Sequence, residues 1–430
     1  MGEPKDVPAE TESRAEGGAA AGVSESVRVS ATVAVGPDGQ TRAVPERIAR
    51  RVWVAAGARC TMCNRYLADE EITGRDVMVG QLAHIVGWST ALGSPRGSDF
   101  LPPNERNLAA NLMLLCYDQH KVIDDRSMWE VSDANTLRAM KRKHELRIRR
   151  LTGMGEERAT TVLRVVGNLH GRPVDLTDNR VTNALLERDR FPDWTLRGAD
   201  ELEIDLRALP GEESSTSGYW ASAREHLEDR LGYLRTQVRK GQVCHLSIFA
   251  LARIPVLVML GTLLDETLPT DFYPKRRDGS EGWGWTAESP QIDFAHTRVQ
   301  AGSDSHRVAV MLSVSGSVDP GRLPPEFDDR YTLYELRPVG TTPTPALIGN
   351  APTLDAFSQA WRKVLAEIEI NHRGTPFIDV FPAVPATAAV SMGRHLMRVA
   401  QPPLRVFDRV GGNDTYQYTI TTSPNDQDYR

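Results

Sequence analysis

The apolar positions of this chain recur with a helical period most clearly between residues 354 and 370. The large apolar residues there fall three or four positions apart, which places them on one face of a helix. They are Leu354, Phe357, Trp361, Leu365 and Ile368. Such a face predicts a helix packed against a core.

Short apolar runs between polar segments predict strands in the same part of the chain. The runs span residues 243–250, 308–314, 331–336, 376–381 and 404–407. Strands that alternate with helices are typical of a layered α/β domain. Nearer the N-terminus the pattern predicts helices over 48–56 and 134–151, and a further helix that opens after Cys116.

The chain divides into three parts by composition. Residues 1–43 are rich in Gly, Ala, Ser, Glu and Pro and nearly lack large apolar residues, so we expect a disordered tail. A compact α+β domain is predicted over 44–152 and an α/β domain over 153–430. No Gly-rich phosphate loop of the Walker or dinucleotide type occurs, so neither ATP nor NAD is implied.

Composition also limits the class of protein. With 430 residues, 40% of them hydrophobic, the chain can bury a core in each of two domains. Its longest apolar run, residues 254–264, is shorter than the roughly 20 residues of a membrane-spanning helix, and its charged N-terminus has no signal-peptide core. Three of the four cysteines lie near histidines, which suits metal binding better than disulfides. We therefore expect a cytoplasmic protein with no membrane partner.

Cysteine and histidine spacing in the first domain indicates a metal site. Cys60-Thr-Met-Cys63 forms a knuckle, and Cys116 follows about fifty residues later. Thiolates in this arrangement are typical ligands of a tetrahedral structural Zn²⁺. A lone pair of cysteines is a weak signal, but this one frames His84, Asn111 and His120.

Three segments around those residues resemble the HNH motif of ββα-metal nucleases. They read Gln81-Leu-Ala-His84-Ile, Asn107-Leu-Ala-Ala-Asn111-Leu-Met-Leu-Leu-Cys116 and Tyr117-Asp-Gln-His120-Lys-Val-Ile-Asp124. The resemblance implies that His84 is the general base for the attacking water and that Asn111 orients the loop carrying it. It also implies that His120 binds a catalytic Mg²⁺ or Mn²⁺ at the scissile phosphate.

Two positions depart from the motif. Ala83 stands where many of these enzymes carry an acidic metal ligand, so another carboxylate must substitute or the metal is held loosely. Gln119 stands where a fourth zinc ligand is expected, so that ligand is unassigned. A purely structural zinc ribbon, with His84 and His120 as ordinary polar residues, is the alternative.

The net charge of −6 argues weakly against a protein that coats nucleic acid, but the helix over 134–151 is locally basic. Its cations predict contacts with the DNA backbone beside the nuclease motif. The residues we expect in those contacts are Arg138, Lys141, Arg142 and Arg149. A solvated helix face is the alternative.

The α/β domain contains the segments His245-Leu-Ser-Ile-Phe249, Pro255-Val-Leu-Val-Met-Leu-Gly261, Asp271-Phe-Tyr273-Pro-Lys275-Arg276-Arg277, Trp283-Gly-Trp285, Leu312-Ser-Val-Ser-Gly316, Phe381-Pro382 and Gly393-Arg394. Together these segments resemble a SAVED domain. The resemblance implies two related Rossmann-like (CARF-like) units that bind a cyclic oligonucleotide in bacterial anti-phage defence.

Residue chemistry in these segments agrees with a nucleotide ligand. Purines need flat apolar partners, and phosphates need cations. We expect the ligand to contact Phe249, Tyr273, Lys275, Arg276, Arg277, Trp283, Trp285, Phe381 and Pro382. The alternative for Phe249 and Phe381 is a place in the core, where a Phe within an apolar strand is found more often.

The two domains together resemble HNH–SAVED effectors of cyclic-oligonucleotide-based anti-phage signalling systems (CBASS). The resemblance implies a double-stranded DNA endonuclease activated when a cyclic dinucleotide, such as a cGAMP isomer, drives a homo-oligomer to form, from dimer to tetramer. Two alternatives remain open. One is an ungated HNH restriction endonuclease whose C-terminal domain reads DNA, and the other is a nucleotide sensor that binds DNA through a degenerate zinc module.

Overall fold

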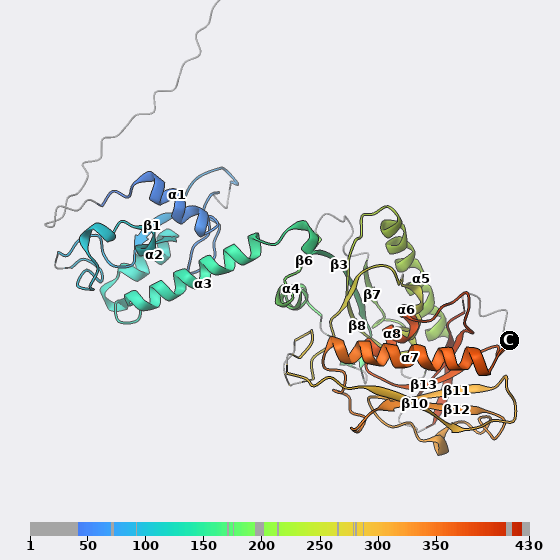
Figure 1. Ribbon diagram of the computed structural model, residues 1–430. Coiled ribbons are helices and arrows are strands. Elements are labelled where there is room, and N and C mark those ends of the chain that lie inside the picture. The colour runs from blue at the N-terminus through green and yellow to red at the C-terminus, as the bar shows by residue number, and fades with distance from the viewer. Residues whose placement is uncertain are drawn as a thin grey trace, which may run out of the picture. The chain divides into compact units, whose positions relative to one another are not determined.

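The chain forms two compact units divided between Gly153 and Met154 (Figure 1). This computed structural model describes residues 42–69, 73–91, 93–169, 172–174, 176–193, 202–212, 215–264, 266–277, 279, 282–286, 288–409 and 415–423. The division lies one residue after the domain boundary expected from the sequence. Residues 1–41 of the predicted tail lie outside the described residues.

The N-terminal unit is built around one ββα element. Strands β1 (Gln81–His84) and β2 (Leu112–Leu115) pair antiparallel, with His84 opposite Leu112, and α2 (Tyr117–Asp124) follows directly. Every residue of β2 is buried, so this strand forms the centre of the unit's core. The hairpin and helix therefore place the end of β1 beside α2.

Two longer helices complete this unit, α1 (Glu46–Ala55) and α3 (Ala134–Thr152). Asp133 caps α3 by accepting a hydrogen bond from the Thr136 amide, as expected for an Asp at a helix start. The buried His144 on α3 bonds the backbone oxygen of Ala56 at 3.0 Å, which ties α3 to the end of α1. All three predicted helices are present, with ends shifted by one or two residues.

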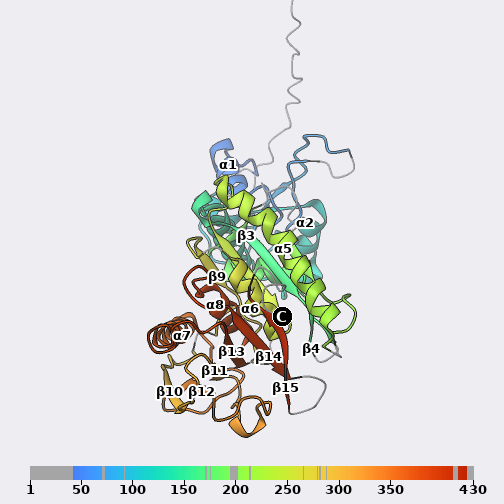
Figure 2. The ribbon, with the colours of Figure 1, turned by 90° about the vertical axis from the view of Figure 1, so that its right-hand side faces the viewer.

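The first half of the C-terminal unit contains a parallel sheet. Its strands are β3 (Ala159–Val166), β6 (Phe191–Pro192), β7 (Glu203–Asp205), β8 (Leu246–Leu251) and β9 (Thr270–Phe272), in the order β6-β3-β8-β9, with β7 also on β3. Its helices are α4 (Asp178–Glu187), α5 (Ser217–Arg239) and α6 (Ile254–Leu263), and a small hairpin joins β4 (Asn168–Leu169) to β5 (Arg172–Pro173). Figure 2 shows α5 beside this parallel sheet, where α5 packs against β7.

The second half contains a mixed sheet of six strands. They are β10 (Phe294–Gln300), β11 (Val308–Ser313), β12 (Thr332–Pro338), β13 (Ile378–Ala383), β14 (Leu404–Arg409) and β15 (Tyr416–Thr421), in the order β10-β12-β11-β13-β14-β15. The central pairs are parallel, and β10 and β15 add antiparallel edges. With α7 (Ala351–Asn371) and α8 (Ala386–Arg394), this confirms the predicted α/β class and each predicted strand. The periodic face of α7 is buried, as predicted.

The two halves meet where α6 crosses α8. A Cβ added to Gly261 on α6 would lie 2.0 Å from the backbone oxygen of Val390, and one added to Gly393 on α8 would lie 1.9 Å from that of Val258. The contact is reciprocal, and each helix follows a central strand of its own sheet. The segment from Pro255 to Leu263 is buried on every side, so the chain's longest apolar run is a core helix. Among the described residues, no helix is long and apolar enough to span a membrane.

Replacing Gly393 with Ala should destabilise the C-terminal unit, because the new methyl group must push two helix backbones apart. Overpacking of this kind costs about 1–3 kcal/mol, and rigid backbone neighbours place this site at the upper end. Gly232→Ala on α5 is the matched control, since nothing lies within 4 Å of its added Cβ. Urea unfolding should show the loss for Gly393→Ala only; equal midpoints for both variants would contradict the close contact.

Candidate functional site

His84 lies at the end of β1, and one of its two ring nitrogens already has a hydrogen-bond partner. Its Nε2 lies 2.8 Å from Oδ1 of Asn107. An amide oxygen only accepts hydrogen bonds, so Nε2 carries the hydrogen and Nδ1 is left to accept a proton. Burial lowers the pKa of His84, with Arg42 and His120 adding to the effect and Asn107 and Asp124 opposing it. The imidazole is therefore neutral near pH 7, as a general base requires.

Asn111 holds the chain that follows His84. Its buried amide accepts a hydrogen bond from the Val86 amide at 2.9 Å, and donates to the backbone oxygens of Val86 at 2.8 Å and Arg106 at 2.9 Å. All three partners are backbone groups. This is the arrangement that an orienting role needs, and it leaves no amide group directed at a reacting atom.

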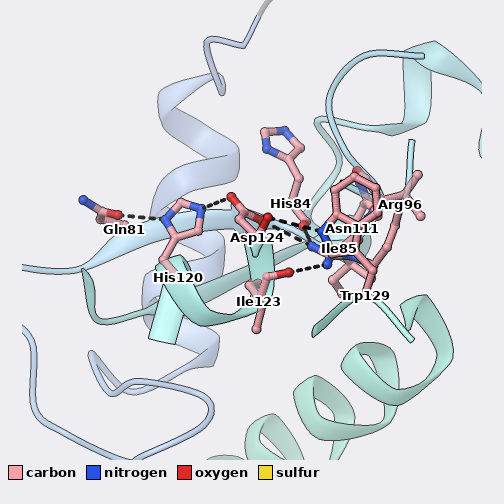
Figure 3. A network of polar contacts seen from close by, with 10 residues as sticks. Gln81, His84, Ile85, Arg96, Asn111, His120, Ile123, Asp124 and Trp129 are labelled. Atoms are coloured by element: carbon pink, nitrogen blue, oxygen red, sulfur yellow. Dashed lines mark hydrogen bonds and ion pairs between the residues drawn. The ribbon is translucent and has the colours of Figure 1, made fainter. Parts of the chain in front are cut away.

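A buried arginine joins the end of β1 to the end of α2. Arg96 donates from Nε to the Ile85 oxygen and from Nη1 to the Ile123 oxygen, both at 2.6 Å. Its Nη2 lies 3.4 Å from both the His84 oxygen and Oδ1 of Asp124. Figure 3 shows this guanidinium between the two segments. Arg96 therefore fixes the position of His84 relative to α2.

His120 lies on α2 between two polar partners. Its Nδ1 is 2.7 Å from Oε1 of Gln81 on β1, and its Nε2 is 3.3 Å from Oδ2 of Asp124 (Figure 3). Burial raises the pKa of Asp124, but His120 and Arg96 outweigh it and bring that pKa below its usual value. An ionised carboxylate thus stands beside His120.

The structure brings His84, Asn111 and His120 together on one ββα element, as the motif predicts. The charges of His120 and Asp124 both act on the pKa of His84, so the three groups share one electrostatic site. Sequence reasoning did not assign Gln81, Arg96, Asn107 or Asp124 to this site. Gln81, Asn107 and Asp124 occur in the segments that carry the motif, and only the tertiary contacts identify their roles.

Three cysteine sulfurs form the predicted cluster. The Sγ atoms of Cys60, Cys63 and Cys116 lie within 4.8 Å of one another, and those of Cys63 and Cys116 are 3.8 Å apart. Tetrahedral zinc with bonds of about 2.3 Å separates its sulfurs by roughly 3.8 Å, so the set fits Zn²⁺. Burial raises the pKa of the Cys60 thiol, but backbone amides of Cys63, Cys116 and Met62 lower that pKa by more, whereas burial raises the pKa of Cys63 to about 11. In the part of the chain that the structure describes, no fourth His, Cys, Asp or Glu joins the set.

The predicted DNA-contacting cations on α3 differ in exposure. Arg142 and Arg149 are exposed, and Arg138 is half-buried and donates to Asn135 at 3.2 Å. Lys141 is buried and paired with Glu145 one turn later, so its charge is already compensated. The prediction that Lys141 contacts DNA therefore does not fit this structure.

The predicted cations of the C-terminal unit line a cavity of about 210 Å³. Lys275, Arg276 and Arg277 follow β9, and the cavity also includes the end of β8 and the first residues of α8. Ligands of open α/β sheets bind at this edge, beyond the carboxyl ends of the parallel strands. The N-terminus of α8 adds a partial positive charge there.

Polar atoms around this cavity lack partners. Nε of Arg276 and Oγ1 of Thr387, which belong to lining residues, are buried, and neither makes a hydrogen bond within the described residues. Leaving such a group unpaired costs about 1–3 kcal/mol, so native proteins rarely gather several in one place. Nη2 of Arg276 pairs with Glu187. The unpaired groups are what a polar ligand would satisfy.

Several predicted aromatic contacts are buried instead. Phe249 stacks on Tyr273 at 4.5 Å and lies 5.8 Å from Trp283, and all three rings are almost fully buried. Phe381 packs in a separate cluster, 4.8 Å from Phe407. Their ring faces are covered by protein, so stacking on a base does not fit this conformation.

Pro382 and Trp285 are half-buried, and Trp285 lies between the cavity residues Gly284 and Thr286. Trp285 itself is not among the residues that line the cavity, and it packs against the core of the C-terminal unit.

A larger cavity of about 700 Å³ lies beside β15, but no predicted site residue lines it. Arg405 is the one cation among its described lining residues, and it bonds the buried Asp379 at 2.6 Å and 2.7 Å. The smaller cavity has three cations, of which Arg276 pairs with Glu187, so the larger cavity with its single paired cation suits a phosphate ligand less well.

Comparison with known families identifies part of the C-terminal unit. Residues 227–421 match SAVED, the "SMODS-associated and fused to various effectors sensor domain" family. The match runs from within α5 to the end of β15, so the C-terminal unit contains a SAVED sensor domain. No curated protein matches the chain.

Solved structures show weaker likeness. The Acinetobacter baumannii Cap4 SAVED/CARF-domain containing receptor with the cyclic trinucleotide 3'3'3'-cAAA is 13% identical over 71% of this chain and 61% of the receptor, with a TM-score of 0.42. A structure of that receptor described without a trinucleotide matches at 13% identity over 71% and 59%, with a TM-score of 0.40. The Moraxella osloensis Cap4 receptor is 12% identical over 76% and 62%, with a TM-score of 0.39. The chain spans about three-fifths of the length of these receptors.

The sulfur cluster predicts that Cys116→Ser removes bound zinc. The serine hydroxyl is a poorer ligand for Zn²⁺ than a thiolate, and β2 and α2 meet at this residue. Zinc content by mass spectrometry of the purified chain should fall from about one ion per chain to nearly none, with a lower melting temperature. Cys244→Ser, which changes an exposed free cysteine outside the cluster, is the control. Equal zinc in both variants would contradict the site.

Proposed function

We propose that this chain is a metal-dependent DNA endonuclease whose N-terminal HNH domain is activated when the C-terminal SAVED domain binds a cyclic oligonucleotide. The observation that carries the nuclease half is the convergence of His84, Asn111 and His120 on one ββα element, with His84 neutral and its Nδ1 able to accept a proton. The SAVED match supports the sensor half.

In the proposed reaction, each site residue of the N-terminal unit has its own role. His84 takes a proton from the attacking water through Nδ1, and the water oxygen displaces the 3′ oxygen from phosphorus. His120 would hold the divalent cation, Mg²⁺ or Mn²⁺, whose charge stabilises the leaving oxygen. Cys60, Cys63 and Cys116 would hold a structural Zn²⁺. Arg142 and Arg149 on α3 are exposed and suit the DNA backbone.

Ligand binding in the C-terminal unit requires a change of shape. The cavity of about 210 Å³ is smaller than typical ligand sites of about 300–1,000 Å³. A cyclic dinucleotide, such as a cGAMP isomer, would enter only if the lining segments move apart. Such movement gives the ligand different affinities for two states, which any gating mechanism needs. Assembly into a dimer or tetramer and a role as a CBASS effector in anti-phage defence belong to the same proposal.

Supercoiled plasmid cleavage tests the proposed function directly. Purified full-length chain is incubated with Mg²⁺ or Mn²⁺ and a panel of cyclic di- and trinucleotides, and products are separated on a gel. We expect cutting only with one ligand. Cutting without any ligand would favour an ungated restriction endonuclease, and ligand binding without cutting would favour a sensor with a degenerate nuclease module.

His84→Ala should reduce ligand-activated cleavage by about 10²- to 10⁴-fold, the usual contribution of a general base. Ligand affinity, measured by calorimetry, should stay unchanged because the cavity lies in the other unit. His226→Ala, at an exposed position of α5, is the control and should cut as the parent does. Full cleavage by His84→Ala would remove this residue from the mechanism.

Arg276→Ala should weaken cyclic-nucleotide binding by about tenfold or more, because a charge-assisted hydrogen bond to phosphate is worth roughly 1.5–3 kcal/mol. The ligand concentration for half-maximal cleavage should rise in proportion, while zinc content stays constant. Arg239→Ala, at an exposed residue of α5 outside the cavity, is the control. Unchanged affinity for Arg276→Ala would place the ligand elsewhere.

A further inference from the structure

Asp124 occupies a position that suits a metal ligand. It follows His120 by four residues on α2, so both side chains lie on one face of the helix. Nε2 of His120 and Oδ2 of Asp124 are 3.3 Å apart. The side chains are 15% and 38% exposed, so water and a phosphate can reach both.

The bond to Gln81 determines which nitrogen of His120 faces Asp124. Oε1 of Gln81 only accepts hydrogen bonds, so Nδ1, at 2.7 Å, carries the hydrogen. In that tautomer the second nitrogen, Nε2, presents its lone pair on the side of Oδ2 of Asp124. One cation between the two atoms can therefore be bound by both.

The spacing suits a shared divalent cation. Two ligand atoms at about 2.0–2.1 Å from Mg²⁺ and at right angles are separated by roughly 3 Å, close to the separation here. Metal-bound histidines usually donate their second nitrogen to a fixed acceptor, the position that Gln81 occupies. Mg²⁺ and Mn²⁺ also prefer carboxylate oxygen, which an imidazole alone does not supply.

Arg96 holds Asp124 with one carboxylate oxygen toward His120, whereas the neighbouring acidic residues are placed differently. Arg96 lies 3.4 Å from Oδ1 and leaves Oδ2 toward His120. Oδ1 of Asp125 accepts from the amide and hydroxyl of Ser127, so that side chain serves a turn. Asp118 is exposed and lies two residues before His120, on another side of the helix.

We propose that Asp124 is the carboxylate ligand of the catalytic cation, in place of the acidic residue absent at Ala83, with Gln81 as the positioning residue for His120. The inference rests on the proposed nuclease function. It explains how this chain supplies an acidic ligand although Ala83 precedes the base: the carboxylate comes from the end of α2 instead of from β1.

Mn²⁺ binding to the full chain tests this assignment without relying on cleavage. The free Mn²⁺ signal in electron paramagnetic resonance is followed during titration of zinc-loaded protein. We expect Asp124→Asn to raise the Kd for Mn²⁺ by at least tenfold, and Asp124→Glu, which keeps the charge, to retain measurable binding. Gln81→Ala should weaken binding about tenfold, as loss of a group that orients a ligand usually does. Asp118→Asn is the matched control and should bind as the parent does.

Two further readouts distinguish a loss of folding from a loss of metal binding, and a loss of metal binding from a loss of nuclease activity. Thermal unfolding of the parent should shift upward with added Mn²⁺, and that of Asp124→Asn should not, although both melt cooperatively without Mn²⁺. Parent-like Mn²⁺ affinity in Asp124→Asn, with ligand-activated cleavage intact, would overturn the assignment and leave the nuclease proposal standing. A parent that neither binds Mn²⁺ nor cuts DNA with any ligand would overturn both.

Discussion

The N-terminal site depends on one buried cation. Arg96 bonds the backbone oxygens of Ile85 and Ile123 at 2.6 Å each, which ties the end of β1 to the end of α2. His84 and the His120–Asp124 pair belong to those two elements, so the guanidinium sets the distance between His84 and that pair. Asn111 fixes the same loop from the other side through Val86. Arg96 and Asn111 thus hold His84 and the His120–Asp124 pair in place, as the proposed catalytic roles require.

Within the C-terminal unit, the crossing of α6 and α8 has a comparable role. Gly261 and Gly393 let the two helix backbones touch, and each helix follows the central strand of its own sheet. The first turn of α8 lines the smaller cavity, and its last turn makes the contact with α6. In the proposed mechanism, a ligand that displaces the start of α8 therefore acts on the helix that joins the two halves.

The local patterns of the chain predict its strands, its helices and the motif, but they do not show which side chains contact one another in the folded protein. His84, Asn111 and His120 are predicted through their resemblance to the HNH motif, because short segments of the sequence carry that motif. Asn107, Gln81 and Asp124 acquire roles only through contacts across the hairpin and along α2. Lys141 lies within a basic run, yet Glu145 one turn later neutralises it. Phe249 and Trp283 show that aromatic residues near cations do not by themselves distinguish a stacking surface from a core.

The most direct test of this account is the position of Mn²⁺ in crystals of the full chain, found by anomalous diffraction near the manganese absorption edge. We predict one peak within bonding distance of Nε2 of His120 and a carboxylate oxygen of Asp124, with His84 close by and Nδ1 directed toward the same space. A peak bound by other residues, or none near α2 at saturating Mn²⁺, would contradict the claim that this ββα element forms a metal-dependent nuclease site.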